Sequence, residues 1–198
     1  MMFSKRPQQI IESAIKIIAE KGVQNLTTKN LAEENGITEP ALYRHFENKL
    51  NIMESILNYF QEVMQSALGE LKGDGNSINT IRCFYLAHIH IMQQNPYFAT
   101  VIFSEANFRF DDYLISKMSN MMNRSQKMLE ESIQAGQQRN ELVTSLTSLS
   151  ISRMLIGSLR LLITQWSISG MIFDLESEGR KLCDDILKLI AQPHARLS

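Results

Sequence analysis

Apolar residues recur along this chain at the spacing of an α-helix, and this pattern constrains the fold more than any other feature. The first stripe occupies positions i, i+3, i+4 and i+7, namely Ile11, Ala14, Ile15 and Ile18. Similar stripes follow in the segments 49–60, 78–92, 112–129, 145–169 and 174–190. No segment shows the convincing polar–apolar alternation of a half-buried strand. The pattern predicts an all-α fold of about nine helices.

The composition excludes several classes of protein. The chain has 198 residues, of which 44% are hydrophobic and 21% charged, as in a folded globular protein. No apolar run is long enough to span a bilayer and no signal-peptide core is present, so we expect a cytoplasmic protein that does not contact membranes. Cys83 and Cys183 match no metal or redox spacing. We therefore expect reduced thiols, no metal and no cofactor.

A short helix, a tight turn and a second short helix are predicted between residues 27 and 46. Thr27 or Thr28 opens the first of them, Gly36 supplies a left-handed turn, and Thr38 is a good N-cap for the second. Leu42 and Phe46, four residues apart, would anchor the second helix. The positions left facing outward are Glu39, Pro40, Ala41, Tyr43, Arg44 and His45. This is the layout of a helix-turn-helix, whose second helix enters the major groove of DNA.

The residue types on this surface suit double-stranded DNA. Tyr43 and His45 can donate hydrogen bonds to phosphate oxygens, and Arg44 is the best candidate for a guanine edge. Ala41 would meet a thymine methyl group. Hydroxyls and an amine at the start of the first short helix come from Thr27, Thr28 and Lys29. Taken singly, each residue is better interpreted as part of an ordinary solvated helix face, and it is their combined spacing that favours DNA. The net charge of −1 excludes binding by bulk charge, so a few placed cations must suffice.

The run TTKNLAEENGITEPALYRHFENKLNI resembles the helix-turn-helix of the TetR family of repressors. The matching positions are Thr28, Ala32, Gly36, Leu42, Tyr43, His45, Phe46 and Lys49. Two departures stand out. Asn35 replaces the usual small residue before the turn glycine, and Glu39-Pro40 stands where many members have a base-reading residue. Glu39 would either accept a hydrogen bond from a cytosine amine or cap the helix.

The resemblance implies a homodimeric repressor that binds a palindromic operator and is released by a small-molecule effector. It implies a helix-turn-helix DNA-binding domain over residues 1–48 and a helical ligand-binding and dimerisation domain over 49–198. In the family, the residues that match Tyr43, His45 and Lys49 contact the phosphate backbone, as do hydroxyl residues that open the second helix. The effector itself is not encoded in any motif.

Candidate effector-binding residues come from the methionines, aromatic residues and paired arginines of the second part of the chain. They are Tyr85, His88, Met92, Phe103, Met118, Met122, Arg153, Gly157, Arg160 and Trp166. Their apolar character favours an apolar effector, although the methionines and aromatics fit a plain core as well. Arg153 and Arg160 would clamp a ligand carboxylate or phosphate, or form ion pairs at a rim or interface. His88 and His90 diverge on a helix and are not expected to share a metal.

Two C-terminal helices carry near-heptad apolar stripes, which favours a four-helix interface between two copies of the chain. The residues expected in the dimer interface are Leu149, Ile156, Ile163, Leu175, Leu182, Ile186 and Leu189. The alternative is that these stripes cover the subunit's own core.

No catalytic grouping is recognisable, since the sequence has no G-x-S-x-G motif and no phosphate-binding loop. We therefore do not expect an enzyme. The competing interpretation is a helical small-molecule-binding or interaction protein with a vestigial DNA reader.

Overall fold

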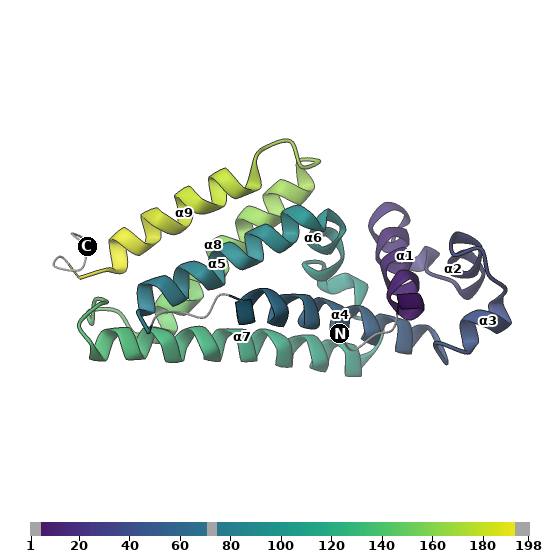
Figure 1. Cartoon of the computed structure of the whole chain (residues 1–198), viewed down its shortest axis with the longest axis horizontal. Helices are drawn as coiled ribbons and strands as arrows, with labels where there is room; N and C mark the ends of the chain where they lie inside the picture. Colours follow the sequence, from purple (N-terminus) through teal and green to yellow (C-terminus); the bar gives the residue numbers. More distant parts are fainter. Residues whose placement is uncertain (1–4, 71–74, 193–198) are drawn as a thin grey trace. The chain divides into compact units, whose positions relative to one another are not determined.

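A computed structural model describes residues 5–70 and 75–192 of the chain (Figure 1). These residues form nine α-helices and two short 3-10 helices and contain no β-strand, which confirms the all-α prediction. One isolated antiparallel bridge, which the sequence did not predict, joins Leu142 to Ala191. The helices form two compact units, and each is described separately below.

Unit 1 contains the described residues up to Val63 together with Asn95–Ser119. Its elements are α1 (Lys5–Lys21), η1 (Val23–Asn25), α2 (Thr28–Glu34), α3 (Glu39–Tyr43), the first part of α4 (Lys49–Glu70), α6 (Pro96–Ile102), η2 (Glu105–Asn107) and the start of α7 (Asp112–Gln138). Unit 1 extends beyond residue 48, so the predicted boundary at this residue would separate two functions and not two compact units. That functional boundary stays a prediction.

The core of unit 1 is built around the isoleucine-rich face of α1, which packs against α2 and α6. The buried residues of α1 are Ile10, Ile11, Ala14, Ile15, Ile17 and Ile18. Polar contacts also join α1 to α4 and α6. Tyr59 donates a 2.8 Å hydrogen bond to Glu12, and Tyr97 donates one of 2.5 Å to Glu20. Burial, with help from Glu12, raises the pKa of Tyr59 to about 12, so its hydroxyl stays a donor at neutral pH.

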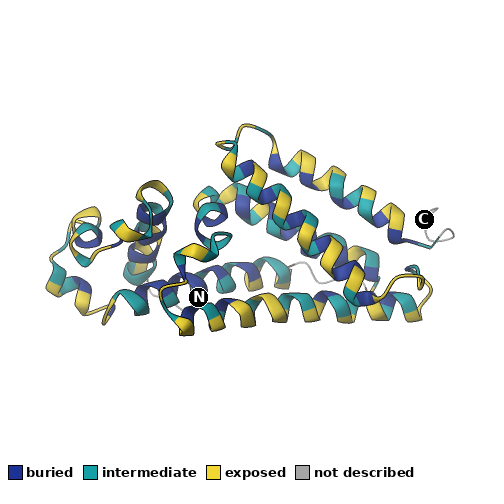
Figure 2. Ribbon diagram, turned by 180° about the vertical axis from the view of Figure 1, so that it is seen from behind, coloured by how far each residue is buried: buried dark blue, intermediate teal, exposed yellow. Residues whose placement is uncertain are grey.

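Unit 2 contains Met64–Gln94 and the described residues from Asn120 onward. Its elements are the end of α4, α5 (Ser77–Gln94), the rest of α7, α8 (Ser148–Ile168) and α9 (Leu175–Ile190). Helix α5 packs against both α8 and α9. The approach to α9 is close at Gly179, where an added Cβ would lie 2.8 Å from the side chain of Ile89. Buried and exposed residues alternate along α8 and α9 at helical spacing, so each helix turns one face inward (Figure 2).

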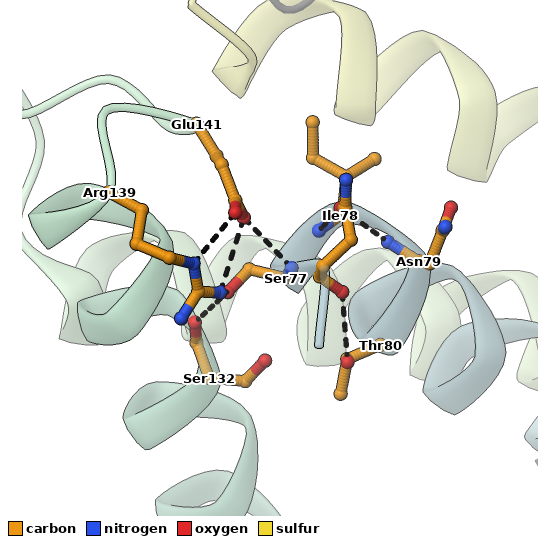
Figure 3. A network of polar contacts seen from close by, with 8 residues as sticks. Ser77, Ile78, Asn79, Thr80, Ser132, Arg139 and Glu141 are labelled. Carbon is orange, nitrogen blue, oxygen red and sulfur yellow. Dashed lines mark hydrogen bonds and ion pairs between the residues drawn. The ribbon is translucent and has the colours of Figure 1, made fainter. Parts of the chain in front are cut away.

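A polar network fixes the N-terminal end of α5 in unit 2 (Figure 3). The backbone N–H of Ser77 donates to Glu141 Oε2 over 2.8 Å, and the Ser77 hydroxyl donates to the carbonyl of Ser132 over 2.7 Å. Arg139 donates to Glu141 Oε1 over 2.7 Å and also to the Ser77 oxygen over 2.7 Å. The arginine and the Ser77 N–H hold the pKa of Glu141 below its ordinary value. One carboxylate therefore satisfies an N–H that the start of the helix leaves without a helical partner.

Glu141→Gln should reduce the free energy of unfolding by about 1 kcal/mol at pH 7, because the charged acceptor of this network is lost. The pKa of Glu141 is lowered in the folded state, so its contribution is present above the ordinary value of 4.5 and disappears as pH falls through the folded value. Urea unfolding at pH 7 and pH 3.5 measures both effects. The control is Glu131→Gln, an exposed glutamate of α7. An equal loss at both pH values would contradict the charge-based explanation.

Candidate nucleic-acid interface

The helix-turn-helix is built by two caps and one glycine, all in unit 1. The Thr27 hydroxyl oxygen accepts from the backbone N–H of Asn30 over 3.1 Å at the start of α2. Gly36 follows α2 with φ at +62°, a conformation that residues with a Cβ rarely adopt. The Thr38 oxygen then accepts from the N–H of Ala41 over 3.4 Å at the start of α3. The predicted caps and turn are therefore confirmed.

Helix α3 has only five residues, so burial of its neighbours must hold it in place. Leu42 is fully buried and Phe46 is only 3% exposed, which turns the other side of α3 outward. Among the predicted DNA contacts, the exposed residues are Thr27, Lys29, Thr38, Pro40, Tyr43, Arg44 and His45, and the half-buried ones are Thr28, Glu39, Ala41 and Lys49. All the predicted residues are therefore at least partly accessible, and their contacts with DNA stay predictions.

Asn35, the first departure from the family pattern, has a structural role. Its side-chain amide donates to the carbonyl of Leu31 over 2.8 Å, and its side-chain oxygen accepts from the Ser13 hydroxyl over 3.2 Å. Its backbone carbonyl accepts from the Arg6 guanidinium over 2.9 Å. A small apolar residue would lack both side-chain bonds. Asn35 thus ties the C-terminal end of α2 to α1.

Glu39, the second departure, is bonded to the other helix of the motif. The Thr28 hydroxyl donates to Glu39 Oε2 over 2.6 Å, so the first residue of α2 is joined to the first residue of α3. Capping of α3 is done by Thr38, as described above. The sequence did not predict the bond, because it joins residues eleven positions apart on different elements.

Lys49 is also engaged within unit 1. Its ammonium donates to the carbonyl of Val23 over 2.9 Å and lies 5.6 Å from the ring centroid of Phe110. Burial lowers the pKa of this ammonium. The contact links the start of α4 to η1, between α1 and α2. An ammonium has three donors, so a phosphate contact by Lys49 remains compatible with this bond and stays a prediction.

Four candidate effector residues, of which His88 is half-buried and the other three are buried, form an interior group of unit 2 on α5 and α8. Tyr85 is buried, and its hydroxyl lies 3.3 Å from that of Ser158. Burial raises the pKa of Tyr85 to about 12. Nδ1 of His88 donates to the Phe84 carbonyl over 2.8 Å, and burial lowers the pKa of this histidine, which favours the neutral ring. Met92 and Trp166 are buried as well.

The other candidate effector residues are not part of that interior group. Phe103 and Met118 belong to unit 1. In unit 2, Met122 is 46% exposed, and Arg153 and Gly157 are exposed on α8, with Arg160 half-buried.

Some of the expected interface residues on α8 and α9 are buried in the subunit, and others are exposed or half-buried. Ile163 and Leu175 are fully buried within the subunit, so they serve its own core. Leu189 is 74% exposed, and the half-buried members are Leu149, Ile156, Leu182 and Ile186. A second stripe, absent from the prediction, is exposed on α8 at seven-residue spacing and consists of Met154, Leu161 and Ile168. Its spacing equals that of Leu149, Ile156 and Ile163, so periodicity alone did not reveal which stripe faces outward.

The described part of the chain was also considered for a metal site and for a membrane-spanning helix. Among residues 5–70 and 75–192, no three His, Cys, Asp or Glu side chains are grouped to hold a metal ion. None of the helices in these ranges combines the length and hydropathy needed to cross a membrane.

Comparison with known proteins matches almost the entire chain to two family models. Residues 10–56 match the model of bacterial regulatory proteins of the tetR family, and residues 53–193 match the C-terminal region of YsiA-like proteins. The nucleoid occlusion factor SlmA of Alteromonas mediterranea is 23% identical over 171 residues, which cover 85% of each chain.

Solved structures share the fold at low sequence identity. The fatty acid degradation regulator FadR of Bacillus halodurans superposes with a TM-score of 0.81 at 17% identity, covering 94% of this chain and 97% of that one. FadR of Bacillus subtilis, solved in complex with stearoyl-CoA, gives a TM-score of 0.78 at 20% identity and covers 92% and 96%. With a helix-turn-helix that exposes Tyr43, Arg44 and His45, and with both parts of the chain matched, this protein belongs to the TetR family of DNA-binding transcriptional regulators.

Proposed function

We propose that this protein is a cytoplasmic, homodimeric repressor that binds a palindromic operator and is released from it by an apolar, acyl-chain-bearing effector. The observation that carries the DNA-binding part is the exposed surface of α2 and α3, on which hydroxyl, amine and guanidinium donors gather over a buried Leu42–Phe46 anchor. A single helix-turn-helix of this size contacts only a few base pairs, so an operator-specific complex needs two copies of the chain.

The outer face of α8 supports dimerisation. Met154, Leu161 and Ile168 are 44%, 59% and 81% exposed, an unusual amount of apolar surface for one helix face. Gly157 lies between Met154 and Leu161 on the same face, and a Cβ there would meet no described atom of the subunit within 4 Å. A glycine inside a helix costs about 1 kcal/mol relative to alanine. No contact among the described residues requires this glycine, and close approach of a second copy would account for it.

The interior of unit 2 supports an apolar effector with a polar end. Tyr85, His88 and Ser158 place polar groups among buried apolar residues of α5 and α8, and burial disfavours the charged forms of Tyr85 and His88. Sites for mainly apolar ligands combine apolar walls with a few polar groups in this way. The complex of the structurally similar FadR with stearoyl-CoA supports the acyl class.

A second candidate function follows from the similarity to SlmA, which is named as a nucleoid occlusion factor. In that case the chain would act in nucleoid occlusion, and its DNA affinity would not need to respond to an acyl ligand. The two proposals differ in one measurable property, which is the response of DNA affinity to the ligand.

Selection of bound sequences from random duplex DNA tests the proposed operator. The purified protein, shown by light scattering to be dimeric, should enrich a palindrome whose half-sites are about one helical turn apart. Its affinity for the recovered site should fall steeply with salt, because phosphate contacts release counterions. Absence of enrichment from folded, dimeric protein would refute a sequence-reading role.

Tyr43→Phe and Arg44→Ala should produce different losses of operator binding. Tyr43→Phe should weaken binding to all operator variants alike, by about three- to tenfold, since a phosphate contact carries no sequence information. Arg44→Ala should cost about 1–3 kcal/mol on the best operator and relax preference at one position of each half-site. Titration of a panel of single-base operator variants separates the two effects. An equal loss across the panel for Arg44→Ala would exclude a base-reading role.

A further inference from the structure

The N-terminal ends of α2 and α3 are joined by a hydrogen bond from the Thr28 hydroxyl to Oε2 of Glu39, 2.6 Å long. Glu39 is half-buried, so this contact restricts the carboxylate instead of leaving it to rotate in solvent. Within the described part of the chain, the other oxygen, Oε1, accepts no hydrogen bond. The bond therefore leaves one acceptor of a partly immobilised carboxylate unused at the start of α3.

A carboxylate at this place is unfavourable for general attraction to DNA. The neighbouring exposed side chains Lys29 and Arg44 carry positive charge, whereas Glu39 adds a negative charge close to where phosphates would lie. Thr38 caps α3, and the bond from Thr28 uses only Oε2 of Glu39. Contact with a hydrogen-bond donor on DNA would use the other oxygen, Oε1.

The major groove offers such a donor on only two bases. Cytosine presents its N4 amine and adenine its N6 amine, whereas guanine and thymine present acceptors to the groove. Adenine places the N7 acceptor beside its amine, so a carboxylate there faces a lone pair as well as a donor. The expected order of preference is cytosine first, adenine second, and guanine and thymine last.

We propose that Glu39 reads a cytosine amine in each half-site through Oε1, and that Thr28 is the positioning residue that holds the carboxylate in place through Oε2. This inference rests on the proposed operator-binding function. It assigns one base of the operator to a residue that departs from the family pattern.

Selection from random duplex DNA, run in parallel on the wild type and four variants, tests this assignment. The wild type should enrich cytosine at one symmetric position, by about tenfold over guanine or thymine. Glu39→Gln keeps an acceptor for Thr28 and adds a donor, so the same position should change to adenine, which pairs with both groups of an amide. Thr28→Val should reduce the cytosine preference to a few-fold, and Thr28→Ser should restore it. Glu33→Gln, a change at an exposed acid of α2, should leave all positions unchanged.

Three results would overturn the inference, and one of them also removes the proposed function. If the wild type enriches a palindrome and Glu39→Gln enriches the same bases, Glu39 does not read DNA. If Thr28→Val lowers affinity equally for all sequences, as a purely structural tie would, Thr28 does not position the carboxylate. Thermal melting of each variant identifies losses caused by misfolding, and Glu39→Gln should melt within a few degrees of the wild type. If the wild type itself enriches no sequence, operator binding fails together with this assignment.

Discussion

Leu161→Glu should convert the protein into a monomer and lower operator affinity by about 10²–10⁴-fold, because two linked readers bind far more tightly than one. Leu161 is 59% exposed in the centre of the α8 stripe, between Met154 and Ile168. In a two-fold dimer each stripe meets its own copy, so the glutamates would approach one another and lose hydration. Analytical ultracentrifugation measures the dimer, and fluorescence anisotropy on a labelled operator measures the affinity.

The matched control for this variant is Met128→Glu, which places the same charge on a 44% exposed apolar position of α7. It should remain dimeric and bind the operator as the wild type does. The far-ultraviolet circular dichroism of Leu161→Glu should be unchanged, since the side chain supports no core. A dimeric, fully binding Leu161→Glu would show that the α8 stripe is not the interface.

Phe46→Ala should reduce the free energy of unfolding by about 3–5 kcal/mol, the usual cost of emptying a buried phenylalanine site. Phe46 is 3% exposed and follows a helix of five residues that has no independent stability. With its anchor removed, α3 loses its fixed position, and operator binding should fall with the stability. Urea unfolding and operator anisotropy on the same preparation test the two effects together.

The control is Phe110→Ala, which removes the same side chain from a 52% exposed site in unit 1. Its ring lies near the Lys49 ammonium, and we expect a loss of under about 1 kcal/mol for that cation–π contact. Equal losses for the two variants would contradict the anchoring role of Phe46.

The helices themselves could be predicted from the sequence because their signals are local. Gly36 and the N-cap threonines Thr27 and Thr38 act within a few residues, and the structure places element ends at or beside them. Asp174 likewise accepts from the N–H of Ser177 over 3.1 Å, as an N-cap at the start of α9 should. The outward position of Tyr43, Arg44 and His45 followed from the four-residue spacing of Leu42 and Phe46.

The contacts that join separate elements could not be predicted in the same way. The Thr28–Glu39 and Lys49–Val23 bonds depend on how three elements pack, and no periodicity encodes that packing. The two stripes of α8 show the limit most clearly. Ile163 and Leu161 both belong to apolar series with a seven-residue repeat, yet the first is fully buried and the second is 59% exposed. Only contact with α5 and α9 selects the inner face.

The central claim, that this regulator releases its operator in response to an acyl effector, is tested most directly by one titration. The operator recovered by selection is labelled, bound by the dimer and titrated with stearoyl-CoA at constant salt, with coenzyme A alone as the control. Operator affinity should fall by about 5–150-fold with stearoyl-CoA, the usual range of allosteric coupling, and should not fall with coenzyme A. Unchanged operator affinity at saturating stearoyl-CoA would contradict the central claim.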